Sequence, residues 1–423
     1  MTSQLEPLSL GHLRNPRALT HGLFRFPGRF HPPLVTYLIQ KHPESRVIGD
    51  PMAGCGTAAV ETAFAGKAGL FSDIDPLACL LTRAKARPVD PEWLVNTVSS
   101  IIEESKPFAK PGVKRAKALK HIRDLEGSTS FRAPPNVFHW FKPYVAVNIC
   151  KVLQSTARIE VDGRRKDTLL AIFASVVRKL SRADPQTSSG LEVTRVRREA
   201  LASGLKFDIA KELTKKGALL ARGYRELRER SLGKLKIVNA DAKDWSEVCS
   251  RLNVWPDLII TSPCYMSAIE YWRRHKLEYF WLGLVNEESL HKLQHEFLGM
   301  GLDDPDLDPL TGYARRMYLR LKRSGYTLEA TRLARYFNDT AAWIREIAKV
   351  VDRSRGTAYV VVGSNSNRGH RIDTPLAIQE IAKSEGLSSQ VYMRYLITNY
   401  HMQYPTKGSR ISNETVLRLR PLS

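Results

Sequence analysis

Acidic residues that could bind a small ligand follow three short apolar runs of the sequence, each of which reads as a strand. The first run leads into Asp50–Thr57 (DPMAGCGT), whose glycines would let the backbone approach a ligand closely at a strand-to-helix turn. Asp73 ends the second run, where a carboxylate can accept hydrogen bonds from both hydroxyls of a ribose. Asp241 follows the third run and could accept a hydrogen bond from an adenine amino group.

The loop after the first run differs from a dinucleotide-binding turn. Such a turn reads G-x-G-x-x-G and is neutral, whereas this loop begins with Asp50. A carboxylate there suits a positively charged amino acid group better than a pyrophosphate. Each aspartate alone could be a helix cap, a common role after a strand, but the acid–glycine loop and the two further acids together favour a cofactor site. The predicted cofactor-binding residues are Asp50, Pro51, Ala53, Gly54, Gly56, Thr57, Asp73 and Asp241.

A second constellation follows the fourth predicted strand, which runs directly into SPCY (residues 262–265). At this point the chain resembles the amino-group DNA methyltransferases, especially their cytosine-N4 branch, whose hallmark is a D/N/S-P-P-Y/F/W tetrad. The loop at 50–57 is similar to that family's DPFxGSGT cofactor loop, and SDIDPLA (72–78) to its ribose-binding GIDxNP. The resemblance covers about half of the chain. It implies S-adenosylmethionine as cofactor and double-stranded DNA as partner.

The resemblance assigns a role to each position of the tetrad. A cytosine amino nitrogen is a poor nucleophile, because its lone pair is delocalised into the ring. Two acceptors aimed at its hydrogens, the side chain of Ser262 and the carbonyl of Pro263, would favour the developing positive charge on nitrogen in the transition state. The ring of Tyr265 would stack on a base flipped out of the duplex. The predicted catalytic residues are Ser262, Pro263, Cys264 and Tyr265.

Cys264 departs from the family tetrad, in which this position is proline. Cytosine-C5 methyltransferases use a Pro-Cys dipeptide on the equivalent loop, where the thiolate attacks the ring, so C5 methylation with Cys264 as nucleophile is the alternative activity. A free cysteine is also often no more than a small buried hydrophobe. The fifth predicted strand leads into VGSNSN, without the glutamate that the C5 family places there. The sequence therefore favours the N4 position.

Three other functions compete with this interpretation. An RNA base methyltransferase would be expected to carry a recognisable RNA-binding module, and none is visible in the sequence. Adenine-N6 methylation would be more typical of aspartate in place of Ser262. A non-catalytic DNA-binding subunit that retains the fold is the alternative from a different class, against which the intact Gly54, Asp73, Ser262 and Tyr265 argue.

These residues require a sheet to bring them together, and the sequence predicts one. Alternation of apolar runs with helical segments is typical of a mainly parallel α/β sheet, so we expect an α/β, Rossmann-like, seven-stranded methyltransferase core. Residues 1–90 and 235–423 would form this catalytic domain, with 91–234 as a large, mainly helical insertion. Residues 285–325 read as an irregular surface loop or lid. The predicted strands are 46–50, 69–73, 235–239, 257–261, 357–363, 390–398 and 414–420.

Net charge indicates where a polyanion would bind. The chain carries +22, of which residues 101–235 contribute +15, from 29 Lys and Arg against 14 Asp and Glu. The insertion is therefore the candidate target-recognition region, in which phosphate contacts position the duplex. Basic residues interleaved with aromatics after the tetrad, in 269–280, could add contacts. The predicted DNA-binding residues are Arg164, Arg165, Lys166, Arg195, Arg197, Arg198, Arg273 and Arg274.

The remaining features concern the cell compartment and partners. Five scattered cysteines without a CxxC pair predict neither a metal site nor a disulfide framework and fit a reducing cytoplasm. No apolar stretch is long enough to cross a membrane, and the first residues lack the apolar core of a secretory signal. The resemblance suggests a restriction-modification role and leaves open a cognate restriction endonuclease as a partner.

Overall fold

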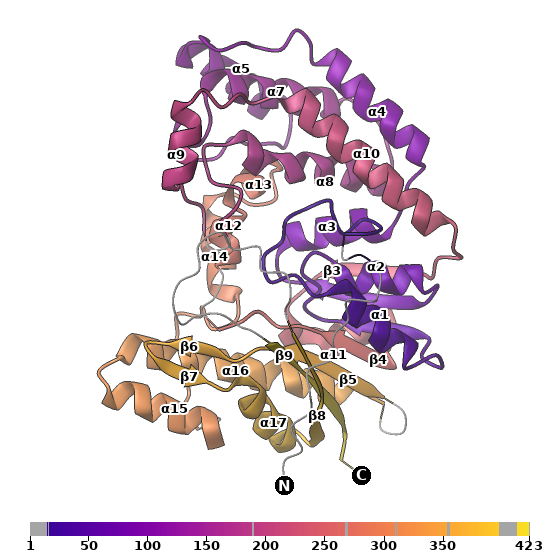
Figure 1. Ribbon diagram of the computed structural model, residues 1–423, viewed down its shortest axis with the longest axis vertical. Coiled ribbons are helices and arrows are strands. Elements are labelled where there is room, and N and C mark those ends of the chain that lie inside the picture. Colours follow the sequence, from indigo (N-terminus) through magenta and orange to yellow (C-terminus); the bar gives the residue numbers. More distant parts are fainter. Residues whose placement is uncertain are drawn as a thin grey trace.

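The fold is organised around one seven-stranded sheet, seen in a computed structural model (Figure 1) that describes residues 15, 17–187, 190–266, 270–308, 310, 312–352, 356–396 and 413–422. The strand order is β3-β2-β1-β4-β5-β9-β8, and β9 alone runs antiparallel to its neighbours. The predicted α/β class and its seven strands are confirmed. The strands are β1 (Val47–Asp50), β2 (Ala68–Asp73), β3 (Leu235–Asn239), β4 (Leu258–Thr261), β5 (Thr357–Val362), β8 (Leu387–Leu396) and β9 (Asn413–Pro421).

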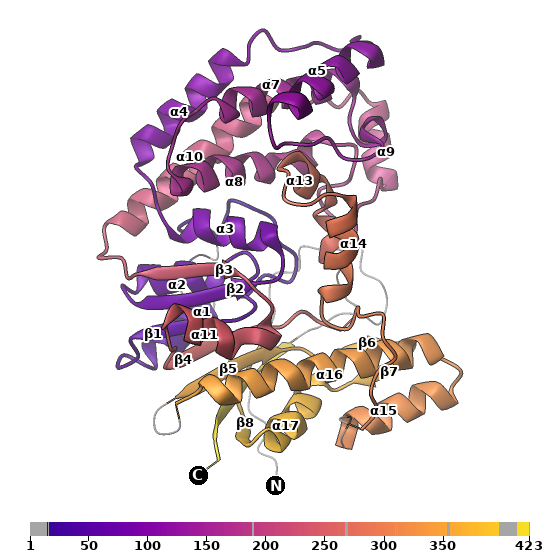
Figure 2. The same ribbon diagram turned by 180° about the vertical axis from the view of Figure 1, so that it is seen from behind.

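Helices cover both faces of the sheet, which explains why its central strands are almost entirely apolar. Along β4, Leu258 and Ile260 pack into the core on one face and Ile259 into the core on the other. The first face is covered by α1 (Pro32–Gln40), α2 (Thr57–Phe64) and α3 (Pro76–Ala86). The second is covered by α11 (Trp245–Leu252), α16 (Thr327–Val350) and α17 (Thr374–Ser384), with α11 and α16 in front of the sheet in Figure 2.

The segment between β2 and β3 is helical beyond α3, as the sequence predicts. It stands above the sheet in Figure 1 and rests on α3 through α8, where Arg83 pairs with Asp167 at 2.7 Å. Buried side chains of this segment and of α1 to α3 form one continuous hydrophobic core. The helices are α4 (Pro91–Glu104), α5 (Arg115–Ser128), α6 (Val137–Trp140), α7 (Pro143–Ala157), α8 (Gly163–Leu180), α9 (Arg195–Ala202) and α10 (Ile209–Arg228).

The expectation of an irregular segment at 285–325 is wrong for two of its parts. Asn286 forms a capping box with Ser289 and starts α14 (Glu287–Glu296). A second helix, α15 (Gly312–Arg323), buries an apolar face that includes Met317 and Leu321. A short hairpin of β6 (Asn365–Asn367) and β7 (His370–Ile372), which the sequence does not predict, follows β5.

Three short elements follow β3 and β4. They are the 3₁₀ helix η1 (Ala242–Asp244) after β3, then α12 (Tyr271–Arg274) and α13 (Lys276–Trp281) after β4. Among the described residues, no helix is both long and apolar enough to cross a membrane.

Gly56 closes the turn between β1 and α2 in a conformation that few other residues could adopt there. Its φ is +78°, and an added Cβ would lie 2.6 Å from Oγ1 and 2.8 Å from Cα of Thr82. We expect Gly56→Ala to lower the free energy of unfolding by about 2–4 kcal/mol, because a left-handed φ and overpacking each destabilise. Urea denaturation would measure this loss.

Gly204→Ala is the matched control for this prediction. Gly204 has a similar φ of +83° but no atom within 4 Å of an added Cβ, so only the backbone strain of about 1–2 kcal/mol should remain. Equal losses in the two variants would contradict the contact with Thr82.

Candidate active site

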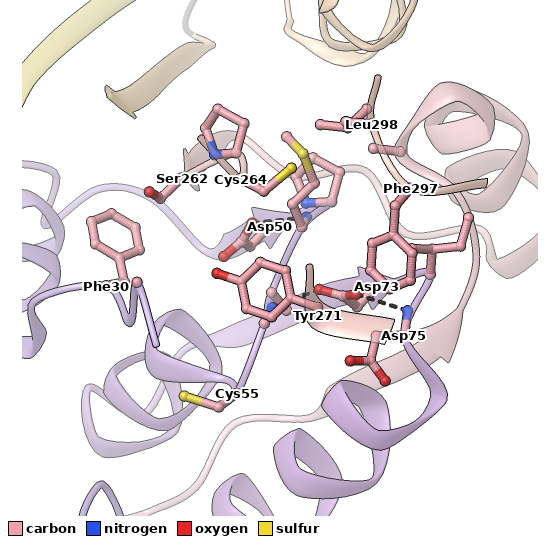
Figure 3. A pocket seen from close by; sticks show the side chains of 18 of the residues that line it. Phe30, Asp50, Cys55, Asp73, Asp75, Ser262, Cys264, Tyr271, Phe297 and Leu298 are labelled. Atoms are coloured by element: carbon pink, nitrogen blue, oxygen red, sulfur yellow. Dashed lines mark hydrogen bonds between the residues drawn. The ribbon is translucent and has the colours of Figure 1, made fainter. Parts of the chain in front are cut away.

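A pocket opens at the carboxyl ends of β1, β2 and β4 and contains about 890 Å³ of empty space, including the part open to solvent (Figure 3). Both predicted constellations line it. Gly56 does not line the pocket, and it packs closely against Thr82 instead. The predicted residues that line the pocket are Asp50, Pro51, Ala53, Gly54, Thr57, Asp73, Asp241, Ser262, Pro263, Cys264 and Tyr265.

The Asp73 carboxylate organises two of the loops around the pocket. It accepts hydrogen bonds from the backbone N–H of Gly54, at 2.7 Å, and of Asp75, at 2.9 Å. The loop that contains Gly54 is also held from α3, where Thr82 Oγ1 donates to the Gly54 carbonyl at 3.1 Å and the buried Lys85 ammonium donates to the Cys55 carbonyl. Asp73 therefore joins the loop after β1 to the loop after β2.

Burial makes this part of the pocket unusually receptive to a positive charge. Asp50 is 2% exposed and accepts a hydrogen bond from the Met52 N–H at 3.0 Å. Burial raises the pKa of Asp50 to about 7. Burial, together with the charge of Asp75, raises the pKa of Asp73 to about 7 as well. A cationic ligand would restore the ionised form of both carboxylates.

The tetrad lies across the pocket and is fixed by partners from two other strands and a helix. Ser262 Oγ donates to the Val361 carbonyl of β5 at 3.0 Å, so its lone pairs are left as acceptors toward the pocket. Tyr336 of α16 donates from its hydroxyl to the Cys264 carbonyl at 2.9 Å. The Tyr265 hydroxyl donates to the carboxylate of Glu414 in β9.

An aromatic wall, defined here as Phe26, Tyr271 and Phe297, closes the pocket and was not predicted. The Tyr271 ring is stacked on Phe26, with centroids 5.1 Å apart, and lies nearly parallel to Phe297 at 6.5 Å. Its hydroxyl donates to the Pro27 carbonyl at 2.9 Å. Figure 3 shows Tyr271 and Phe297 beside Asp73. The enrichment of aromatics after the tetrad hinted at part of this wall.

A buried Asp75–His275 pair positions Tyr271. Asp75 caps α3 with one carboxylate oxygen and contacts His275 Nδ1 with the other, at 2.9 Å. Both side chains are almost fully buried, and the backbone N–H of His275 donates to the Tyr271 carbonyl at 2.9 Å. The pair thereby ties the loop after β2 to the helix after the tetrad.

Cys264 lines the pocket among anionic groups. Burial and the nearby carboxylates of Asp73 and Asp339 raise the pKa of its thiol to about 12. Asp241 has its carboxylate near Lys243, which it meets at 3.4 Å through the ammonium group and at 2.9 Å through the backbone N–H.

Two of the predicted DNA-binding arginines have structural partners instead. Arg274 is 2% exposed and donates to the Thr187 and Arg25 carbonyls, so burial leaves no guanidinium face for a phosphate. Arg197 caps the end of α8 by donating to the carbonyls of Lys179, at 3.0 Å, and Ser181. The sequence shows that both residues are basic, but it does not show that their side chains are bound by backbone carbonyls rather than exposed.

The other predicted DNA contacts fall at opposite ends of α8. Arg195 and Arg198 are exposed on α9, beside the α8 terminus that contacts α12. Arg164, Arg165 and Lys166 lie at the other terminus, where the first two border a surface hollow with Arg87 and Arg228. The 11 residues of α3 separate that end from the pocket by about 16 Å. Arg273 is exposed and pairs with Glu270 at 3.3 Å.

Comparison with known proteins gives two relatives that are both described as Type II methyltransferases. The chain is 22% identical over 429 residues to the Type II methyltransferase M.MvaI of Kocuria varians, which covers 96% of this chain and 91% of that protein. It is 31% identical over 91 residues to the Type II methyltransferase M.MjaII of Methanocaldococcus jannaschii, covering 21% of this chain and 17% of that protein. No family model matches the chain.

Among solved structures, the rRNA methyltransferase aviRa from Streptomyces viridochromogenes aligns over 93% of this chain and 88% of its own, with 10% identity and a TM-score of 0.32. The two sequence relatives support an S-adenosylmethionine-dependent methyltransferase. Among such enzymes, the chain is similar to those named Type II methyltransferase.

Cofactor affinity should depend on pH because carboxylates with a pKa of about 7 line the site. Each must be ionised to interact with a cationic ligand, so binding is strongest above that pKa and weakens as the pH falls through it. Between about pH 8 and pH 6 we expect the Kd to rise up to about tenfold per carboxylate. Calorimetry with S-adenosylmethionine should also detect proton release on binding near pH 6.

Asp73→Asn provides the control for this pH dependence. The amide keeps the size of the side chain but does not titrate, so only the part of the pH dependence that comes from Asp50 should remain, and the affinity at pH 8 should fall by at least about tenfold. An unchanged profile in a folded variant would show that Asp73 does not contact the cofactor.

Proposed function

We propose that the protein is an S-adenosylmethionine-dependent DNA methyltransferase that transfers a methyl group to cytosine in a specific sequence, with the N4 position favoured. One observation carries this proposal: the acid–glycine loop of Asp50–Thr57 and the tetrad Ser262–Tyr265, far apart in the sequence, line the same pocket. The relatives named Type II methyltransferase agree with it. We extend the proposal to a restriction-modification role, with a cognate restriction endonuclease as a candidate partner.

The donor set of the pocket fits this cofactor. S-adenosylmethionine would supply an activated methyl group on a sulfonium centre, and it carries a second positive charge on its amino group. Asp50 would hold the amino acid end, Asp73 the ribose hydroxyls and Asp241 the adenine amino group. Buried carboxylates with raised pKa values match a cationic ligand, because its charge replaces the solvation they lack.

The tetrad would supply acceptors and a platform for the target base. The Ser262 hydroxyl donates its hydrogen bond to the Val361 carbonyl, so in this arrangement it would act toward a cytosine amino group as an acceptor. The Pro263 carbonyl would be the second acceptor, and both would stabilise the nitrogen as it becomes positively charged. Tyr265, held at its hydroxyl by Glu414, would present its ring to the flipped base.

The surroundings of Cys264 favour the N4 over the C5 position. A C5 enzyme needs a thiolate at this position, and thiolates form where positive charges or helix N-termini lower the pKa. Here burial and two carboxylates raise the pKa of Cys264. C5 methylation stays the alternative activity because the thiol does line the pocket.

The tetrad provides the test of this chemistry. If Ser262 is an acceptor for the amino group, Ser262→Ala should lower the rate by about 10²-fold or more, while Cys264→Pro, which restores the family tetrad, should retain activity. The measurement is the amount of N4-methyl- and C5-methylcytosine in digested DNA after single-turnover reactions. Unchanged cofactor affinity would show that the variants remain folded.

The C5 alternative predicts the opposite order. Cys264→Ser would then abolish turnover, and wild-type enzyme would become covalently attached to DNA that contains 5-fluorocytosine. Such an adduct, or C5-methylcytosine in the product, would contradict the N4 assignment. A subunit without catalytic activity would bind DNA but transfer no methyl group in either assay.

The positions of the basic clusters predict which of them contacts DNA most closely. Removing the charges of Arg195 and Arg198, beside the pocket end of α8, should weaken DNA binding and reduce the slope of log K against log salt by about 0.9 for each lost phosphate contact. The same change at Arg164 and Lys166, at the distant end, is the matched control. Equal slopes for both double variants would contradict this placement.

A further inference from the structure

The β6–β7 hairpin projects from the catalytic edge of the sheet. Strand β5 carries Val361, the acceptor of the Ser262 hydroxyl, and ends at Val362. Strand β6 begins at Asn365, three residues later, which corresponds to about 10 Å of extended chain. The hairpin therefore starts close to the tetrad.

The hairpin is braced rather than free. Its base is anchored by Ile372, which is fully buried, and by the Tyr313 hydroxyl, which donates to the Arg371 carbonyl at 3.2 Å and accepts from the Asp373 N–H at 2.8 Å. Closer to the tip, the His370 ring packs edge-on against Tyr326, with centroids 6.1 Å apart. One face of the ribbon is thus held against the start of α15 and α16.

The opposite face carries an exposed hydroxyl and an exposed guanidinium group. Ser366 and Arg371 are paired across the ladder and both are exposed. The side chain of Arg371 has no partner within the described part of the chain. At the turn, Arg368 and Gly369 have φ values of +49° and +77°, and the Arg368 guanidinium pairs with Glu329 at 2.7 Å. The hairpin itself, residues 365–372, contains no acidic residue.

The hairpin also lies on the flank where DNA would approach. In Figure 1, α9, α14 and the hairpin follow one another down the left side of the molecule, and they occupy the right side in Figure 2. The residue after α14, Phe297, belongs to the aromatic wall of the pocket. A duplex whose flipped base entered the pocket would have α9 toward one end and the hairpin toward the other.

We infer that the β6–β7 hairpin enters a groove of the DNA and reads base edges there with Arg371, assisted by Ser366. A two-stranded ribbon fits the major groove, and arginine can donate two hydrogen bonds to guanine. This inference rests on the proposed function, because it takes duplex DNA as the substrate. It adds a recognition element in the catalytic domain to the one expected in the insertion.

Arg371→Lys is the informative substitution. Lysine keeps the charge that attracts phosphate but loses the planar, two-donor recognition of a base. Random-sequence DNA would be methylated by the full chain, and the modified sites would be read by sequencing. We expect the preference for the favoured base to fall roughly tenfold to hundredfold at one position of the site in both Arg371→Lys and Arg371→Ala, with the Kd for S-adenosylmethionine unchanged.

Arg46→Ala is the matched control. Arg46 is also exposed, but it precedes β1 and so lies at the amino-terminal ends of the strands, away from the pocket. It should leave the site preference unchanged. An identical preference in wild type and both Arg371 variants would overturn the inference, as would a uniform loss of activity at all sites. If the wild-type chain bound cofactor but methylated no DNA, the proposed function itself would fail, which is a distinct result.

Discussion

A single buried carboxylate, that of Asp73, joins the two loops on which the pocket depends. It accepts the backbone N–H groups of Gly54 and Asp75 and so fixes the loops after β1 and β2 relative to each other. A buried charge is stabilised only by such bonds or by an opposite charge. Asp50 and Asp75 place further negative charge nearby, so the ionised carboxylates repel one another. A bound cation would relieve this repulsion.

The loop after β2 also fixes the position of the aromatic wall. Asp75 contacts His275 across 200 residues of sequence, and His275 holds the backbone of Tyr271. Arg274 precedes His275, and its carbonyl accepts a hydrogen bond from Arg178 at the end of α8. The aromatic wall, the helix after the tetrad and the helical segment above the sheet are therefore connected to the cofactor loops through contiguous polar contacts. A shift of α8 would be transmitted to Tyr271 by this route.

The sequence predicts what is local in this arrangement. Short apolar or β-branched runs mark all seven strands of the sheet, and Asp50 and Asp73 stand directly at the ends of β1 and β2. Tyr271, His275, Phe297 and Glu414 escaped prediction because each reaches the site only through tertiary packing. Arg274 was misassigned for a related reason: a basic residue between aromatics reads as exposed, whereas loop carbonyls satisfy its guanidinium inside the protein.

The anionic character of the pocket also constrains its chemistry. A thiol becomes a nucleophile by ionising, which requires positive neighbours, and the carboxylates that suit a cationic cofactor have the opposite effect on Cys264. Neutral acceptors such as the Ser262 hydroxyl and the Pro263 carbonyl are not subject to this conflict. In amino-group transfer the attacking nitrogen gains positive charge, which the same negative field stabilises. One electrostatic environment can thus serve both cofactor binding and N4 transfer, whereas C5 transfer would need Cys264 to be shielded from it.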